Sequence, residues 1–147
     1  MPLREQDPDN SPRILIVEDH PLIAELVETR LRIEGLRATR CVGGREAIER
    51  VSQEPFDLVI LDIMMPDIDG YEVLAHIRSR KATRNLPVIF LTARSSQEDI
   101  DKGLRLGADH YITKPFSGAE LARTVKILLE ERKLPLARQG QLGTEGP

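Results

Sequence analysis

Short runs of consecutive apolar residues alternate along this chain with longer segments in which apolar residues recur every three or four positions. The first pattern is typical of strands buried on both faces of a sheet, and the second is typical of amphipathic helices. Five such pairs follow one another, each a strand and then a helix. The predicted strands are residues 13–17, 36–42, 58–61, 87–92 and 109–113.

Residues at the ends of the helical segments set the limits of the helices. Pro21 suits the first turn of the first helix, and Gly35 suits its C-terminal cap. The second helix opens at Gly43-Gly44, and the last ends near Arg132. The other three helices begin with a capping pair; these pairs are Asp69 with Glu72, Ser95 with Glu98, and Ser117 with Glu120.

The fourth predicted helix, residues 96–106, has the weakest pattern. Its main apolar residues are Ile100, Leu104 and Leu106, and Gly103 lies inside it. A glycine costs about 1 kcal/mol relative to alanine within a helix. We therefore expect this helix to be among the least stable elements, which suits a part that moves.

The alternation of strands and helices predicts a single α/β domain. Crossovers of helix length join parallel strands, so the five strands should form a doubly wound parallel sheet with helices on both faces. We place this domain at residues 13–132. Residues 1–12 are rich in Pro and polar residues, which predicts a flexible arm. Residues 133–147 hold Pro, Gly and Gln, which predicts a disordered tail.

Composition excludes several classes of function. The chain has 147 residues, 40% of them hydrophobic, and a formal net charge of −3 that gives no reason to expect direct nucleic-acid binding. No apolar run approaches the ~20 residues of a membrane span, and the polar start lacks the apolar core of a signal peptide. We therefore expect a cytoplasmic protein without membrane contact, with the single cysteine, Cys41, as a small core residue.

Carboxylate, hydroxyl and ammonium side chains lie at the ends of four predicted strands. The central strand, residues 58–61, runs directly into Asp62, and Pro66 with Asp69-Gly70 then forces a turn. The other strand ends carry Glu18-Asp19, Thr92 and Lys114. Parallel strands bring all of these to one edge of the sheet, which is where open α/β sheets bind their ligands.

Three carboxylates at one edge need compensating charge. At ~4 Å and an effective dielectric constant of ~20, each pair of like charges repels by about 4 kcal/mol. Lys114 offsets part of this repulsion, and a divalent cation such as Mg²⁺ would offset the rest. A metal and an ammonium beside a free carboxylate favour phosphoryl transfer to that carboxylate.

Each of these residues also has a simpler interpretation when taken alone. Asp19 fits a helix cap equally well, Thr92 fits a strand position, and Lys114 fits a solvated charge. Tyr111 is by default a half-buried aromatic residue. The three histidines, His20, His76 and His110, fit polar surface groups. The joint arrangement favours the functional interpretation.

The full set of residues resembles the receiver domain of two-component response regulators, of the chemotaxis type with a single-domain fold. The shared motifs are Glu18-Asp19, Asp62-x-x-Met65-Pro66-x-x-Asp69-Gly70, Thr92-Ala93 and Lys114-Pro115-Phe116. The similarity covers roughly residues 12–132. It implies a flavodoxin-like (βα)5 fold with the strand order 2-1-3-4-5.

The resemblance also implies a role for each site residue. Asp62 accepts a phosphoryl group from a histidine kinase or a histidine phosphotransfer protein. The ligands of Mg²⁺ are Glu18, Asp19, Asp62 and the main-chain carbonyl of Met64. Thr92 and Lys114 contact the phosphoryl group, and Tyr111 is the aromatic residue of the switch. The Lys114–Pro115 bond is cis. The positions of Met64 and Arg94 vary within the family and tune the lifetime of the phosphate.

Three further points stay open at the level of sequence. A downstream protein or a second copy would bind the face formed by the fourth helix, the fifth strand and the fifth helix. The chain is either a stand-alone receiver or a piece of a longer protein. Two rival functions remain. One is a haloacid-dehalogenase-like phosphatase, but the D-x-D-x-[TV] motif of those enzymes is replaced here by Glu18-Asp19-His20-Pro21. The other is an inert docking domain, and the complete set of acids, Thr and Lys argues against it. We expect a signalling phosphoacceptor that catalyses only its own phosphorylation and dephosphorylation.

Overall fold

A computed structural model of the chain describes residues 10–132. The elements are β1 (Arg13–Val17), α1 (Pro21–Ile33), β2 (Arg37–Cys41), α2 (Gly44–Gln53), β3 (Leu58–Leu61), α3 (Gly70–Ser79), β4 (Val88–Thr92), α4 (Gln97–Arg105), β5 (His110–Thr113) and α5 (Gly118–Arg132). The strands form one parallel sheet in the order β2-β1-β3-β4-β5. The predicted α/β fold and strand order are therefore confirmed, and β2 lies at an edge.

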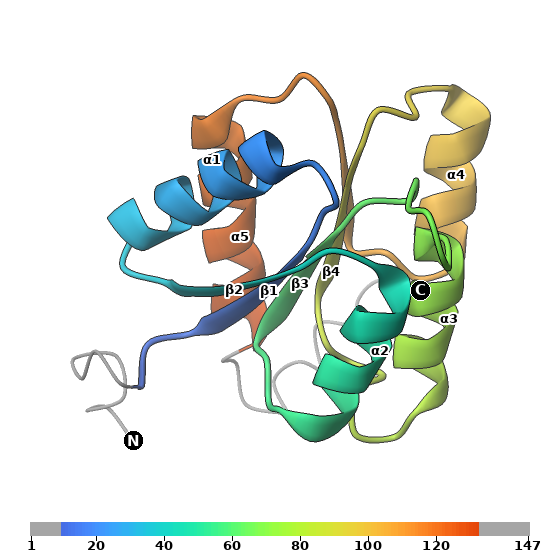
Figure 1. Ribbon diagram of the computed structural model, residues 1–147, viewed down its shortest axis with the longest axis horizontal. Helices are drawn as coiled ribbons and strands as arrows, with labels where there is room; N and C mark the ends of the chain where they lie inside the picture. Colours follow the sequence, from blue (N-terminus) through green and yellow to red (C-terminus); the bar gives the residue numbers. More distant parts are fainter. Residues whose placement is uncertain (1–9, 133–147) are drawn as a thin grey trace, which may run out of the picture.

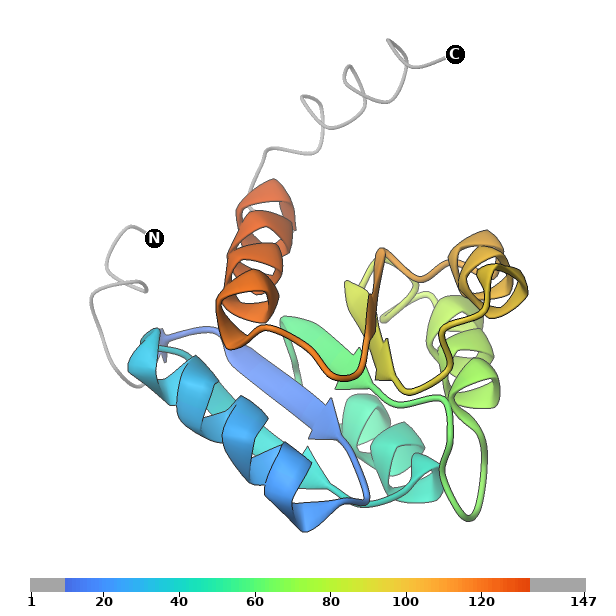
Figure 2. The ribbon, with the colours of Figure 1, turned by 90° about the horizontal axis from the view of Figure 1, so that it is seen from above.

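Helices cover both faces of the sheet. Helices α1 and α5 lie on one side, and α2, α3 and α4 lie on the other (Figures 1 and 2). Alternate residues of β1 belong to two separate cores: Leu15 and Val17 face α2 and α3, whereas Ile14 and Ile16 face α1 and α5. The continuous apolar runs in the sequence follow from this double burial, because both faces of each central strand are covered.

The register of the sheet aligns the strand ends that carry the predicted site. Val17 pairs with Leu61, and Leu61 pairs with Phe90. The backbone bonding continues one residue past the strands, since the Asp62 N–H donates to the Val17 carbonyl at 3.1 Å. The Lys114 N–H likewise donates to the Thr92 carbonyl at 2.8 Å. The hydrogen bonds of the sheet therefore fix the backbone positions from which the Asp62 and Lys114 side chains extend.

The start of α4 differs from the predicted one by a residue. The N-cap is Ser96, whose hydroxyl accepts from the Asp99 N–H at 3.1 Å, so the predicted pair of Ser95 and Glu98 is wrong. Both pairs fit the capping pattern, and contacts of Asp99 with neighbouring elements select the second. Leu104 and Leu106 are 45% and 46% exposed, so they contribute little to the core.

Most of the two predicted terminal segments lies outside the described residues. Of the predicted arm, residues 10–12 are described, and there the Arg37 side chain donates to the Ser11 carbonyl at 2.9 Å. Within residues 10–132, no helix combines the length and apolar character needed to cross a membrane. Cys41 is buried in the core beside α2, and burial raises the pKa of its thiol to about 12.

Candidate functional site

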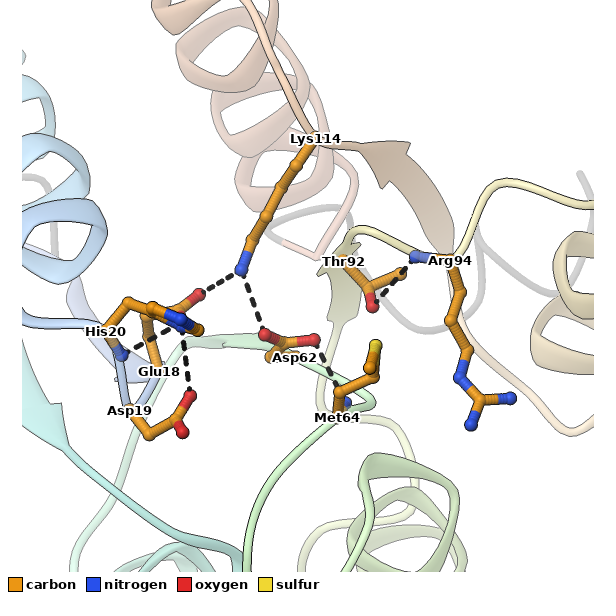
Figure 3. Close-up of polar contacts among 8 residues, drawn as sticks. All are labelled: Glu18, Asp19, His20, Asp62, Met64, Thr92, Arg94 and Lys114. Carbon is orange, nitrogen blue, oxygen red and sulfur yellow. Dashed lines mark hydrogen bonds and ion pairs between the residues drawn. The ribbon is translucent and has the colours of Figure 1, made fainter.

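Lys114 joins two acidic strand ends at the carboxyl edge of the sheet. Its ammonium nitrogen donates to Glu18 Oε1 at 2.7 Å and to Asp62 Oδ2 at 2.9 Å (Figure 3). Both acids are 4% exposed. Burying a charge is tolerated only when the charge is paired and hydrogen-bonded, and this shared ammonium supplies that pairing.

The two carboxylates keep Lys114 charged. Burial alone would lower the pKa of the Lys114 ammonium, but the hydrogen bonds that it donates to Glu18 and Asp62, together with their negative charges, outweigh burial, so the pKa is raised. The site therefore carries a permanent positive charge against at least two negative ones. Binding an incoming anionic group at this site would therefore require positive charge in addition to that of Lys114.

The side chain of Asp62 is held at both oxygens. Oδ1 accepts from the Met64 N–H at 3.0 Å, while Oδ2 accepts from Lys114. Behind it the loop packs closely: a Cβ built on Gly70 would lie 2.5 Å from the Asp62 carbonyl oxygen. The Met64 side chain itself is 52% exposed at the mouth of the site.

Asp19 is the acid for which the protein supplies least compensation. Its Oδ1 is buried and has no hydrogen-bond partner among the described residues. The Nδ1 of His20 lies 3.4 Å from this oxygen, on a side chain that is 68% exposed. Together with Glu18, these residues bring three possible metal-binding atoms within 4.8 Å of one another. A buried carboxylate oxygen without a hydrogen bond fits a site for a cation.

Thr92 and Tyr111 both contact the backbone of Arg94, the second residue after the end of β4. Thr92 is fully buried, and its hydroxyl accepts from the Arg94 N–H at 3.4 Å. The Tyr111 hydroxyl donates to the Arg94 carbonyl at 2.9 Å. Burial raises the pKa of Tyr111 to about 12, so the phenol remains a donor. The two predicted switch residues thus contact the same backbone segment.

The predicted site residues are therefore gathered at one edge, and the Lys114–Pro115 bond is cis. Compared with known families, residues 14–126 match the model described as the response regulator receiver domain. The chain belongs to this family. This assignment agrees with the sheet order and with the position of Asp62 at the end of the central strand.

Several curated proteins similar to this receiver domain are named as transcriptional regulators. The transcriptional activator protein PfeR of Pseudomonas aeruginosa is 43% identical over 88% of this chain and 42% of its own length. This receiver domain spans about half the length of the curated relatives it matches.

Solved structures of receiver domains are similar to this structure. The receiver domain of the Francisella response regulator 1452 has a TM-score of 0.78 and 36% identity, and the match covers 84% of this chain and 100% of that one. The receiver domain of the sensor histidine kinase PA1611 from Pseudomonas aeruginosa PAO1, described with a magnesium ion coordinated in the active site cleft, has a TM-score of 0.76 and 33% identity, covering 82% of this chain and 98% of that one.

Asp67 is a residue of the receiver domain's site loop whose contact the sequence did not predict. Its carboxylate accepts from the Gly44 N–H at 3.0 Å and from the Arg45 N–H at 3.1 Å, at the start of α2. A Cβ on Gly43 would lie 2.9 Å from the same carboxylate. The start of α2 at Gly43-Gly44 therefore binds an anion that the protein itself supplies.

Replacing Asp67 by Asn should destabilise the domain at neutral pH but not at low pH. Backbone hydrogen bonds from Arg45, Ile68 and Gly44 lower the pKa of Asp67 from 3.8 to about 2. The stabilisation is thus present above pH ~4 and is lost as the pH falls towards about 2. Because Asp67 is exposed, we expect only about 0.5–1 kcal/mol at pH 7.

Urea unfolding of both proteins at pH 7 and near pH 2.5 measures this difference. A stability gap of the same size at both pH values would contradict the role of the Asp67 charge.

Proposed function

We propose that this receiver domain accepts a phosphoryl group on Asp62 within a two-component or phosphorelay pathway. The observation that carries the proposal is the buried Asp62 carboxylate at the end of β3, paired with Lys114 at 2.9 Å and bordered by Glu18 and Asp19. Incubation with Mg²⁺ and a small phosphodonor, followed by mass spectrometry, tests it. A base-labile mass gain of one phosphoryl group is expected.

The proposed reaction transfers the group from a phosphohistidine of a kinase or a histidine phosphotransfer protein. A carboxylate oxygen of Asp62 forms a bond to phosphorus while the bond from phosphorus to the donor nitrogen breaks, and that nitrogen keeps the electron pair. Lys114 neutralises charge on the phosphoryl oxygens, and the Thr92 hydroxyl donates to one of them. Water later cleaves the acyl phosphate, so the domain catalyses only its own phosphorylation and dephosphorylation.

An exposed apolar groove beside Lys114 supports a protein donor. The groove has a volume of about 720 Å³ and runs along α1 to the start of α5. Its apolar lining consists of Ile23, Leu26, Ile33, Pro115 and Phe116. A small phosphodonor has no need of such a surface, whereas a helical partner that brings a phosphohistidine to Asp62 does.

Glu18, Asp19, Asp62 and the Met64 carbonyl would hold Mg²⁺ in this proposal. The ion prefers oxygen ligands and would supply the positive charge that Lys114 alone does not. The buried Oδ1 of Asp19, which has no hydrogen-bond partner among the described residues, fits this role, because a buried carboxylate oxygen without a hydrogen bond is otherwise costly. The magnesium described for the PA1611 receiver domain agrees with the assignment.

Mg²⁺ should raise the melting temperature of the domain. With a dissociation constant in the millimolar to sub-millimolar range, about −4 to −6 kcal/mol, a tenfold excess adds about 1.4 kcal/mol of stability. For a domain of this size that corresponds to roughly 3–6 °C. Differential scanning fluorimetry at constant ionic strength measures the shift.

Asp19→Asn is the matched variant for this measurement. It should lose most of the response to Mg²⁺, since it removes a charged ligand while keeping the shape of the side chain. A melting temperature that ignores millimolar Mg²⁺ in the parent protein would contradict the metal site.

The proposed switch starts at Thr92. A phosphoryl group on Asp62 adds about −1.5 to −2 of charge, and the Thr92 hydroxyl moves to meet it. Its hydrogen bond from the Arg94 N–H is then given up, and Tyr111 moves into the space that Thr92 leaves. The face formed by α4, β5 and α5 changes as a result, and a downstream protein or a second copy binds it.

A hydrogen bond from Thr92 alone supplies too little free energy for the switch. Changing the ratio of active to inactive conformation from 1:99 to 99:1 needs about 5.5 kcal/mol. One charge-assisted hydrogen bond supplies about 1.5–3 kcal/mol. Lys114 must therefore contribute as well.

Beryllofluoride, a phosphoryl mimic, should change amide exchange in α4 and at Tyr111 as well as near Asp62. The reason is that Arg94 connects the two regions through its backbone. Exchange measured by mass spectrometry or NMR with and without the mimic checks this. Changes that stop at the site loop, with none in α4, would contradict the switch.

A phosphatase of the haloacid-dehalogenase type fits less well. Its nucleophile would be the first Asp of a D-x-D-x-[TV] motif after the first strand, whereas β1 is followed here by Glu18-Asp19-His20-Pro21. The names of the curated relatives describe transcriptional regulators. We therefore propose a signalling role for this receiver domain, in which the phosphorylated face binds a downstream partner or a second copy.

A further inference from the structure

His20 brings an imidazole ring to the acidic edge of the site. It directly follows Asp19 and is the N-cap residue of α1, a position where Ser, Thr, Asp or Asn normally caps the helix. The His20 side chain makes no capping hydrogen bond. Its ring lies instead beside the two acids that precede it, with Nδ1 at 3.2 Å from Glu18 Oε2 and 3.4 Å from Asp19 Oδ1 (Figure 3). One nitrogen therefore faces two carboxylate oxygens, although the sequence alone predicted a polar surface group here.

A hydrogen bond from His20 cannot satisfy both of these oxygens. A ring N–H points well at only one acceptor at a time, because hydrogen bonds prefer angles above about 150°. Glu18 Oε2 is within hydrogen-bond distance of the ring at 3.2 Å, and Lys114 binds the other oxygen of Glu18. Asp19 Oδ1 is buried and has no hydrogen-bond partner within residues 10–132. A cation placed among the three atoms would compensate both acids at once.

The spacing of the three atoms fits ligands of one metal ion. Two ligands at about 2.1 Å from an ion lie about 3.0 Å apart at an octahedral right angle and about 3.4 Å apart at a tetrahedral angle. The distances of 3.2 and 3.4 Å from His20 Nδ1 agree with these values. All three atoms lie within 4.8 Å of one another. The ring therefore lies close enough to share an ion with both acids.

We propose that His20 is a ligand of the cation held by Glu18 and Asp19, and that its nitrogen raises the affinity of the site for transition-metal ions such as Mn²⁺ and Co²⁺. Mg²⁺ prefers oxygen ligands, whereas imidazole is a good ligand for first-row transition metals. The inference deepens the proposed function and rests on its metal site. It adds a nitrogen to the oxygen ligands assigned there, so this receiver domain is less selective for Mg²⁺ than a site of oxygen ligands alone.

His20→Asn tests the ligand by comparing two ions. Asn is a good helix N-cap, and its amide can still donate a hydrogen bond to Glu18, but it lacks the imidazole. Isothermal titration calorimetry with Mg²⁺ and with Co²⁺, at one pH and ionic strength, measures the dissociation constants. The constant for Co²⁺ should rise at least about tenfold in the variant, whereas the constant for Mg²⁺ should rise by less than about twofold.

His110→Asn is the matched control. His110 is an exposed histidine at the first residue of β5, the opposite end of that strand from Lys114. This variant should bind both ions as the parent does. A loss of affinity by the same factor for Mg²⁺ and Co²⁺ in His20→Asn would show that His20 positions Glu18 and does not bind the ion, which would overturn the proposal.

Pulsed EPR of bound Mn²⁺ detects a coordinating nitrogen directly. The electron spin echo of the parent should carry the modulation of a coordinated imidazole nitrogen. This modulation should change when histidine alone is labelled with ¹⁵N, and it should be absent from His20→Asn. The labelling experiment uses the parent sequence, so it does not depend on how the variant folds.

The outcomes separate the ligand from the metal site itself. If Mg²⁺ and Mn²⁺ bind but no histidine nitrogen is coordinated, the role of His20 is overturned and the proposed function stands with oxygen ligands alone. A modulation that persists in His20→Asn would place another histidine at the ion and equally overturn the assignment. If neither Mg²⁺ nor a transition-metal ion binds to the parent, the metal site of the proposed function fails, and the inference fails with it.

Discussion

Asp62→Asn is expected to abolish phosphorylation and to leave the fold intact. The amide is neutral and is a poor nucleophile for phosphorus, whereas its size and shape match those of the carboxylate. Its oxygen can still accept from the Met64 N–H, as Asp62 Oδ1 does at 3.0 Å. The Lys114 ammonium loses one of its two carboxylate partners but keeps Glu18 at 2.7 Å.

Asp69→Asn is the matched control for this experiment. Asp69 lies in the same loop and caps α3 by accepting from the Glu72 N–H at 2.9 Å. Asn caps helices about as well as Asp, so this variant should be labelled like the parent. Intact mass after incubation with a phosphodonor, together with circular dichroism, measures both proteins. An Asp62→Asn protein that still gains the base-labile mass would show that another residue is the acceptor.

Gly70→Ala is expected to destabilise the domain and to slow phosphorylation together. The added methyl would lie 2.5 Å from the Asp62 carbonyl oxygen and 2.7 Å from Ile63 Cα, and both are backbone atoms that cannot turn aside. Overpacking of this kind typically costs about 1–3 kcal/mol. The strand end must shift to relieve it, and Asp62 shifts with it.

Gly118→Ala provides the control for glycine replacement in a first helical turn. A Cβ there would lie 3.7 Å from the nearest atom, the Arg30 Cδ, which is an ordinary contact. Alanine also favours a helix by up to about 1 kcal/mol relative to glycine, so stability should be unchanged or slightly higher. Urea unfolding compares the stabilities of the parent and both variants. Phosphorylation rates are compared under conditions in which all three proteins are folded. A Gly70→Ala protein as stable and as readily labelled as the parent would contradict the close packing behind Asp62.

The sequence predicted the features that depend on local pattern and on sheet topology. The run of residues 58–61 is apolar without interruption because β3 is covered on both faces, and Asp62 follows it directly. Parallel topology then brought Glu18 and Lys114 to the same edge, although they are far apart in the chain. No side-chain geometry was needed for this step, since the register of a parallel sheet supplies it.

The features that escaped prediction depend on contacts between distant segments. Ser95 and Ser96 each stand three residues before an acid, so local pattern could not choose between them. The choice follows from Asp99, which also binds the Tyr71 hydroxyl and the Arg94 guanidinium. The bond from Asp67 to the start of α2 spans more than twenty residues of chain, and a short polar residue in a loop gives no sign of it.

Main-chain atoms make the connection between Thr92 and Tyr111. The Arg94 N–H and carbonyl carry the two hydrogen bonds, and every amino acid except proline offers both groups. Substitutions at this position therefore leave the connection in place while they change the side chain beside the site. Under the proposed function, the duration of a signal can then drift from one lineage to the next while the ability to transmit it is inherited unchanged.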